Sequence, residues 1–156
     1  MFKKFVCQNP QKIFNEIILI QNYNDIEINK NKIFMPFACI YDQCDLNTDE
    51  TSFLKRLLLA GMYYFDAIGP DSSKKHDSVD WLQVMITDID GEMNIEDIET
   101  FWEKGDKYDS INDTIDRICQ IMTDSDFTHC NQLIVVTLDL RYYEQLTQKL
   151  EYIMDE

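Results

Sequence analysis

The segment from Phe37 to Asp80 constrains the fold of this chain more than any other. An apolar run from Phe37 to Tyr41 ends in Asp42, and a second apolar run from Met62 to Ile68 ends at a Gly-Pro turn. Between them, the helical spacing of apolar residues stops at Gly61, where glycine suits a left-handed helix C-cap. A strand, a helix and a strand in this order predict one unit of a parallel sheet.

Strand and helix patterns alternate through the rest of the chain. Apolar runs predict strands at 37–41, 62–68, 98–102 and 133–138, although 98–102 also fits a helix. Helical spacing predicts helices at 47–60, 71–86, 110–122 and 142–154. This order indicates one α/β domain over residues 1–156. We expect a doubly wound, mostly parallel sheet of about four strands with helices on both faces, Rossmann-like or flavodoxin-like.

Two stretches near the N-terminus need separate interpretation. Residues 1–31 precede the regular pattern, and apolar residues in 2–6 are compatible with an edge strand. The spacing of apolar residues in 13–18, after Pro10, predicts an amphipathic helix from about Gln11 to Gln21, and 26–28 is compatible with a short strand. Because Pro36 has no N–H for a strand ladder, pairing in the first strand of the main pattern is expected to begin at Phe37.

The charge balance limits the kinds of partner. The chain has 29 acidic and 14 basic residues, a net charge of −15 at pH 7. Such a field repels nucleic-acid phosphates and anionic membrane surfaces, so we expect a basic protein as any macromolecular partner. The alternative is that the charge only keeps the protein soluble.

Neither a signal peptide nor a membrane span is predicted. The apolar run 17–20 is far shorter than the roughly 20 residues that a span requires, so we expect a cytoplasmic location. Five cysteines, an odd number without a Cys-x-x-Cys pair, mostly lie in apolar runs. They are expected to be reduced thiols that pack as small apolar side chains.

Several short motifs together resemble a family of small bacterial proteins known only as a domain of unknown function. They are Pro36-Phe37, the run 58–61, Tyr64, the turn 69–72 and the run 77–80. The resemblance covers most of the chain after residue 35 and implies the same strand and helix order, without an established activity. Where the family has Trp, Cys and His, this chain has Ile68, Ser72 and Glu103, so the resemblance implies no His-based or Cys-based site here.

Polar residues are expected at the carboxyl ends of the parallel strands, where α/β folds bind ligands. This predicts a small-ligand or nucleotide site formed by Asp71, Ser72, Ser73, Lys74, His76 and Asp80. The N–H groups of the helix start favour an anion there. However, the chain has neither a Gly-x-Gly-x-x-Gly nor a P-loop motif, and the same residues also suit a turn and a helix cap.

An EF-hand-like pattern is the most specific metal motif in the sequence. Asp88, Asp90, Glu92 and Glu99 stand at the first, third, fifth and twelfth positions of such a loop. The sixth position, which requires glycine, holds Met93, and there is no second loop to pair with. With only two histidines, a zinc site would need scattered ligands, so we expect no metal and no cofactor.

Catalytic motifs are equally sparse. Ser72 or Ser73 near His76 has the spacing of a nucleophile and a base, but helix capping explains it as well. We therefore predict a binding protein that neutralises or regulates a basic partner, such as an immunity protein or antitoxin against a bacterial effector. The predicted contact residues are Asp42, Asp45, Asp88, Asp90, Glu92, Trp102, Glu103 and Tyr108.

Overall fold

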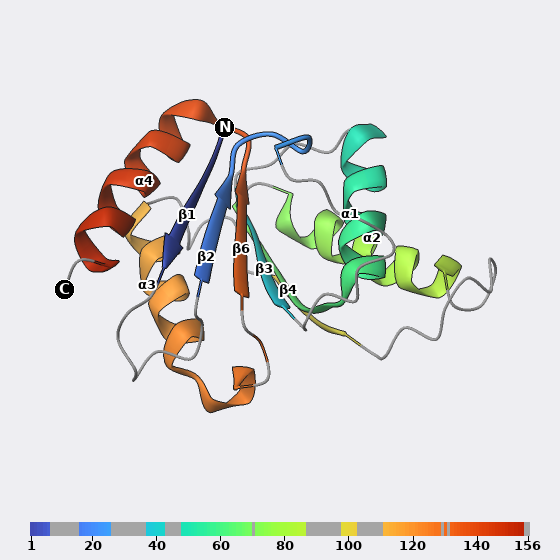
Figure 1. Ribbon diagram of the computed structural model, residues 1–156. Coiled ribbons are helices and arrows are strands. Elements are labelled where there is room, and N and C mark those ends of the chain that lie inside the picture. Colours follow the sequence, from blue (N-terminus) through green and yellow to red (C-terminus); the bar gives the residue numbers. More distant parts are fainter. Residues whose placement is uncertain are drawn as a thin grey trace.

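The computed structural model describes residues 1–6, 16–25, 37–42, 48–69, 71–86, 98–102, 111–128, 130 and 132–154. The strands are β1 (Phe2–Val6), β2 (Glu16–Ile20), β3 (Phe37–Asp42), β4 (Met62–Ile68), β5 (Glu99–Trp102) and β6 (Gln132–Thr137). The helices are α1 (Thr48–Ala60), α2 (Ser72–Val84), α3 (Ile111–Thr123) and α4 (Leu140–Met154), with a short 3₁₀ turn, η3 (Ser125–Phe127), after α3 (Figure 1).

The strands form one six-stranded sheet in the order β1-β2-β6-β3-β4-β5. β1 is antiparallel to β2, and all the other neighbours are parallel. The predicted mostly parallel α/β sheet is therefore confirmed. The predicted number of about four strands was wrong, because β1 and β2 extend the sheet beyond β6.

The expected helix from about Gln11 to Gln21 was wrong where the structure describes it. Residues 16–20 form β2, which pairs with β1 on one side and β6 on the other. A continuous apolar run fits the helical and the strand period equally well, so the spacing did not discriminate between them. The burial of consecutive residues explains the strand: Ile17 and Ile18 are both buried in the sheet, as in a strand covered on both faces. The possible strand at 26–28 lies outside the described residues.

The strand-helix-strand unit around α1 follows the prediction closely. β3 begins at Phe37, whose N–H donates to the carbonyl of Gly61. Gly61 has φ of 107°, a conformation that glycine adopts without steric cost, and it ends α1 as expected. The stretch 98–102, for which helix and strand competed, contains the strand β5.

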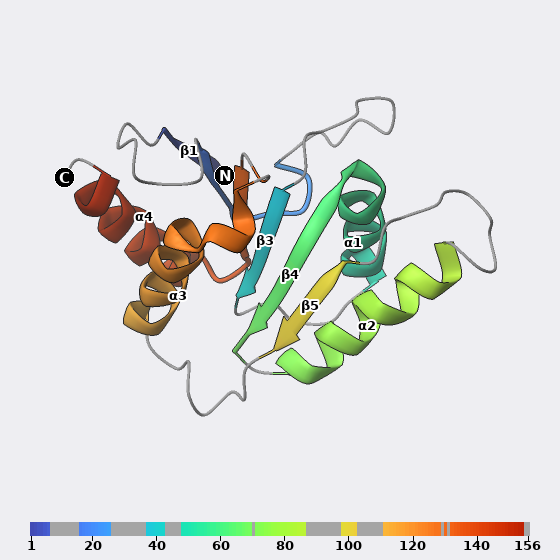
Figure 2. The same ribbon diagram turned by 90° about the horizontal axis from the view of Figure 1, so that it is seen from below.

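Two hydrophobic clusters hold the helices to the sheet. The first contains buried residues of α1 and α2, and the second contains buried residues of α3 and α4. Neighbouring residues of one strand alternate between them: in β6, Ile134 belongs to the first cluster and Val135 to the second. Figure 2 shows α1 and α2 lying together, apart from α3 and α4.

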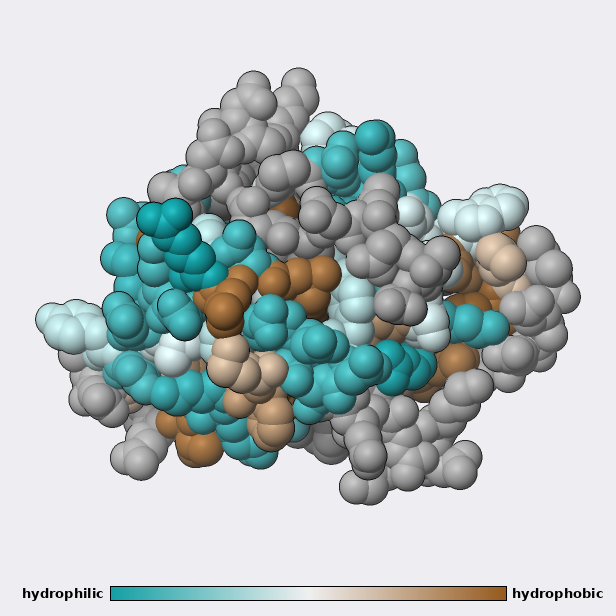
Figure 3. Space-filling model, turned by 90° about the horizontal axis from the view of Figure 1, so that it is seen from above, coloured by the Kyte–Doolittle hydropathy of each residue, from teal (hydrophilic) through white to brown (hydrophobic). Residues whose placement is uncertain are grey.

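One face of the molecule is largely polar over its described residues (Figure 3). Seen from above, hydrophilic residues surround smaller hydrophobic areas (Figure 3). Among the described residues, no helix has the length and apolar character needed to cross a membrane.

Candidate functional site

The last strand of the sheet, β5, together with α2 forms the main candidate site. We call it the β5–α2 edge and define it by His76, Asp77, Asp80 and Trp81 of α2 with Glu99, Thr100, Phe101 and Trp102 of β5. Figure 2 shows the two elements side by side, with β5 as the outermost strand.

β5 forms a strand because Thr, Phe and Trp favour extended backbone. It pairs in parallel with β4, from Tyr64 opposite Glu99 to Ala67 opposite Trp102. Within the described part of the chain it pairs with no other strand. Phe101 is 46% exposed and Trp102 is 40% exposed, so two large aromatic side chains reach solvent from the outermost described strand.

Thr100 joins β5 to α2 through two polar contacts. Its Oγ1 lies 2.8 Å from Oδ1 of Asp80 and 3.1 Å from Nε2 of His76. On its other side, Nδ1 of His76 lies 3.1 Å from Oδ1 of Asp77 and 3.6 Å from Oδ2 of Asp80. A hydroxyl, an imidazole and a carboxylate therefore lie in sequence, as they do in nucleophilic catalytic sites.

The directions of the hydrogen bonds at Thr100 argue against a nucleophilic catalytic site. The carboxylate of Asp80 only accepts, so the hydroxyl of Thr100 donates its single proton to Asp80. Nε2 of His76 must then donate to Thr100 instead of accepting from it. Because His76 does not serve as the base for this hydroxyl, the cluster fastens β5 to α2 and does not activate a nucleophile.

Exposed carboxylates belong to the β5–α2 edge together with its aromatic residues. The side chain of Asp77 is 78% exposed, and those of Asp80 and Glu99 also reach solvent. Trp81, on the outer side of α2, is 59% exposed. The edge therefore combines apolar area with negative charge, which suits a cationic partner surface.

The predicted ligand residues around 71–80 separate into exposed and buried groups. Asp71 precedes α2 in the left-handed region, with φ of 57°, and its side chain makes no capping hydrogen bond. Lys74 is exposed and pairs with Asp71 at 3.1 Å, whereas the adjacent Lys75, which we did not predict, is only 1% exposed. Ser72 is buried, and the ring nitrogens of His76 contact Thr100 on one side and Asp77 and Asp80 on the other.

Many of the predicted partner contacts fall on parts of the chain that the structure does not describe. Trp102 is exposed, as a contact residue must be. Asp42 ends β3, opposite Ile68 of β4 and Thr137 of β6. The following predicted residues lie outside the described ranges: Asp45, Asp88, Asp90, Glu92, Glu103 and Tyr108. The EF-hand-like loop is outside them as well, apart from its final glutamate.

A buried polar cluster that we did not predict lies between β4 and α3. Nε of Arg117 lies 2.5 Å from Oδ2 of Asp66, a fully buried carboxylate, and a second guanidinium nitrogen donates to the hydroxyl of Tyr64. Burial, together with the nearby Asp66 charge, raises the pKa of Tyr64 above its usual range. The one sequence clue was Asp66, the only charged residue in an apolar strand.

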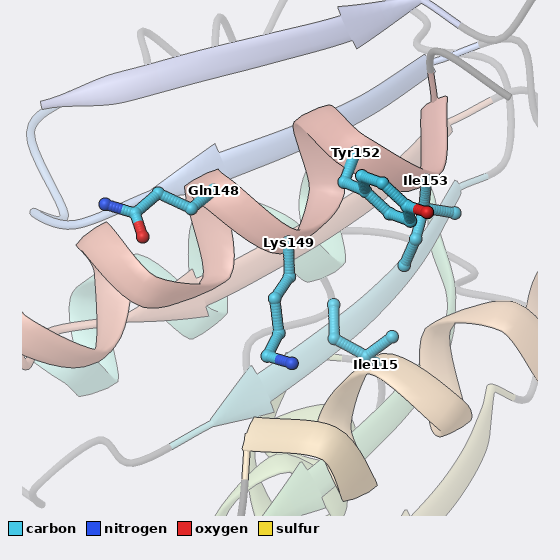
Figure 4. Close-up of a pocket in the computed structure, with 5 residues that line it drawn as sticks. All are labelled: Ile115, Gln148, Lys149, Tyr152 and Ile153. Carbon is cyan, nitrogen blue, oxygen red and sulfur yellow. The ribbon is translucent and has the colours of Figure 1, made fainter.

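A groove of about 310 Å³ lies between α3 and α4. It is lined by Ile115 of α3 and by Gln148, Lys149, Tyr152 and Ile153 of α4. Figure 4 shows Lys149 extending from α4 toward α3, beside Ile115. None of the lining residues belongs to the β5–α2 edge or to the predicted sites.

Neither a metal centre nor a known relative assigns a function. In the described ranges, no group of three or more His, Cys, Asp or Glu residues is arranged to hold a metal ion. Comparison with protein-family models, curated proteins and solved structures finds no match for this chain.

Proposed function

We propose that this protein binds a basic protein partner through the β5–α2 edge and thereby neutralises or regulates it, as an immunity protein or antitoxin does with a bacterial effector. One observation carries the proposal: Phe101 and Trp102 are exposed on the outermost strand, whose Thr100 is hydrogen-bonded to the exposed carboxylate of Asp80.

Aromatic side chains at such positions provide the binding energy. Tryptophan and other aromatic residues are frequent hot spots, because they bury a large area with little loss of conformational freedom. Carboxylates on the same edge accelerate encounter with a cationic surface and disfavour acidic proteins. A net charge of −15 extends this attraction beyond contact distance.

The cations elsewhere in the described structure do not cancel this charge. Lys3 pairs with Glu151, and Lys4 pairs with Glu16. Lys74 pairs with Asp71 and Arg117 with Asp66. Each of these cations is matched by a carboxylate of the protein itself, so the excess of acidic residues is available to a partner.

Affinity capture from the native host tests the proposal when it is combined with matched variants. We expect the wild type to retain one basic protein in stoichiometric amount and to release it in high salt. Trp102→Ala and Phe101→Ala should each weaken retention by at least about tenfold, a typical hot-spot effect. Tyr152→Ala removes an exposed aromatic of α4, 70% exposed, and should leave retention unchanged.

Two outcomes would contradict this function. In one, the retained protein is acidic or neutral and binds independently of salt. In the other, the variants of β5 and the α4 control retain the same protein equally well. Either result would show that the β5–α2 edge does not bind a basic partner.

A second candidate is a small-ligand or nucleotide site at the start of α2, where Asp71 and Lys74 are exposed and Ser72 is buried. The N–H groups and the dipole of a helix N-terminus attract an anionic group. If ATP or GTP raises the melting temperature, Ser72→Ala should abolish the rise. Ser78→Ala, whose hydroxyl donates to a carbonyl of the same helix, should not. Unchanged melting with both nucleotides would remove this candidate.

Three further expectations belong to the same proposal. The two separate hydrophobic clusters support a doubly wound, Rossmann-like or flavodoxin-like sandwich. Membership in the bacterial family of unknown function that the chain resembles is part of the proposal. A cytoplasmic location is tested by fractionating host cells with an antibody against the protein.

A further inference from the structure

We infer that the partner contributes an extended, cationic segment that adds to the sheet as a new strand alongside β5. This inference rests on the proposed function and specifies how the β5–α2 edge is used. The observation behind it is that β5 pairs with β4 alone among the described strands and that the side chains of Glu99, Phe101 and Trp102 are exposed.

An outermost strand presents backbone N–H and C=O groups that another strand can pair with. Proteins commonly protect such strands with lysine, proline or a bulge. The β5 sequence Glu-Thr-Phe-Trp contains no lysine or proline, and its pairing with β4 is regular. The backbone of β5 is therefore suited to strand addition, a common mode of peptide recognition.

The side chains of β5 specify the chemistry of the added strand. Successive residues point to opposite faces, so Glu99 and Phe101 share one face while Thr100 and Trp102 share the other. Asp80 adds a carboxylate beside Thr100. Each face thus offers one aromatic ring and one carboxylate, which lysine or arginine contacts through cation–π and ionic interactions. A segment with cations on both faces fits this edge.

The contacts of Thr100 prepare β5 for this role. Its hydrogen bonds with Asp80 and His76 hold the strand against α2 before any partner arrives. A strand that is already ordered does not lose further conformational entropy on binding. A second copy of this chain is disfavoured as the occupant, because two chains of charge −15 repel each other.

Tryptophan fluorescence provides a local test, since the chain has only two tryptophans. The Trp81→Phe variant of the full chain leaves Trp102 as the only reporter. We expect a short peptide that repeats Lys-Lys-Val-Val, which places lysines on both faces of an added strand, to change Trp102 emission saturably. The amide protons of residues 99–102 should exchange more slowly in the complex. A glutamate–valine peptide of the same length should produce neither effect.

Backbone methylation separates strand pairing from charge attraction. The lysine–valine peptide N-methylated at every residue keeps its charge but has no N–H to donate. We expect at least about tenfold weaker binding of this peptide. If it binds equally well, strand addition is wrong while the proposed function stands. Strand addition is also wrong if neither the unmethylated nor the methylated lysine–valine peptide changes Trp102 emission. The same holds if the change in emission instead follows self-association of the chain. The capture experiment fails separately if no basic protein depends on Trp102.

Discussion

The two edge strands, β1 and β5, expose similar apolar residues but differ in charge. Phe2 and Val6 are exposed on β1, as Phe101 and Trp102 are on β5. β1 also carries Lys3 and Lys4, whereas β5 carries Glu99 and no cation. Exposed apolar area therefore does not distinguish a protected edge from a binding edge in this protein.

The lysines of β1 are engaged within the molecule. Lys3 contacts Glu151 of α4, and Lys4 lies 2.7 Å from Glu16 of the neighbouring strand β2. Lysine side chains in particular, on an edge strand, oppose its pairing with other chains. The comparison suggests that β1 closes its end of the sheet, while β5 presents the other end to a partner. Variants near the two ends of the sheet test how strongly each end is stabilised.

Arg117→Met should have the largest effect, because it leaves the carboxylate of Asp66 buried without its cation beneath the β5 end of the sheet. Breaking a buried ion pair from one side costs about 3 to 5 kcal/mol. We expect the free energy of unfolding to fall by this amount in urea denaturation. Arg141→Met, on the exposed start of α4, should change it by less than about 0.5 kcal/mol.

The double variant Asp66→Leu with Arg117→Leu sharpens this test. Replacing both charges by apolar residues removes the desolvation cost together with the attraction, so stability should return near the wild-type value. If the double variant is as unstable as Arg117→Met, packing of the guanidinium against Tyr64 matters more than its charge.

Thr100→Val should have an intermediate effect. The change preserves side-chain shape but removes the hydrogen bonds to Asp80 and His76. We expect a loss of about 1 to 2 kcal/mol and faster amide exchange in β5. Thr123→Val removes hydroxyl contacts to carbonyls of its own helix and serves as the control. Unchanged exchange in β5 would show that β4 alone holds the strand.

The fold was predictable where local signals agree. β4 has the predicted limits because Gly61 and Gly69 bound its apolar run, and both have positive φ. β2 was missed because four apolar residues in succession satisfy either period. Only its place between β1 and β6 makes it a strand, and that depends on pairing with residues more than a hundred positions away.

The candidate site was less predictable than the fold, because its contacts link distant residues. The strand run ending at Trp102 and the polar positions His76 and Asp80 were identified from the sequence. The bonds that join them through Thr100 span 20 and 24 residues and depend on how α2 packs beside β5. Arg117 was missed for the same reason, since its partner Asp66 is 51 positions away.

Lys4→Ala should have the smallest effect, because its ion pair with Glu16 is partly exposed to solvent. Such pairs contribute a few tenths of a kcal/mol, and salt screens them. The hydrogen bond from Lys4 lowers the pKa of Glu16 below its usual value of 4.5. The contribution of this ion pair to the free energy of unfolding is therefore fully present above about pH 4.5. It disappears as the pH falls through the lowered pKa of Glu16.

Wild type and Lys4→Ala should thus differ slightly in stability at neutral pH and converge in acid, as thermal denaturation across pH would show. Lys149→Ala, which removes an exposed lysine of α4, should match the wild type at every pH. A difference that persists below the pKa of Glu16 would mean that Lys4 stabilises β1 through its aliphatic chain. The β1 edge would then be protected by packing and not by charge.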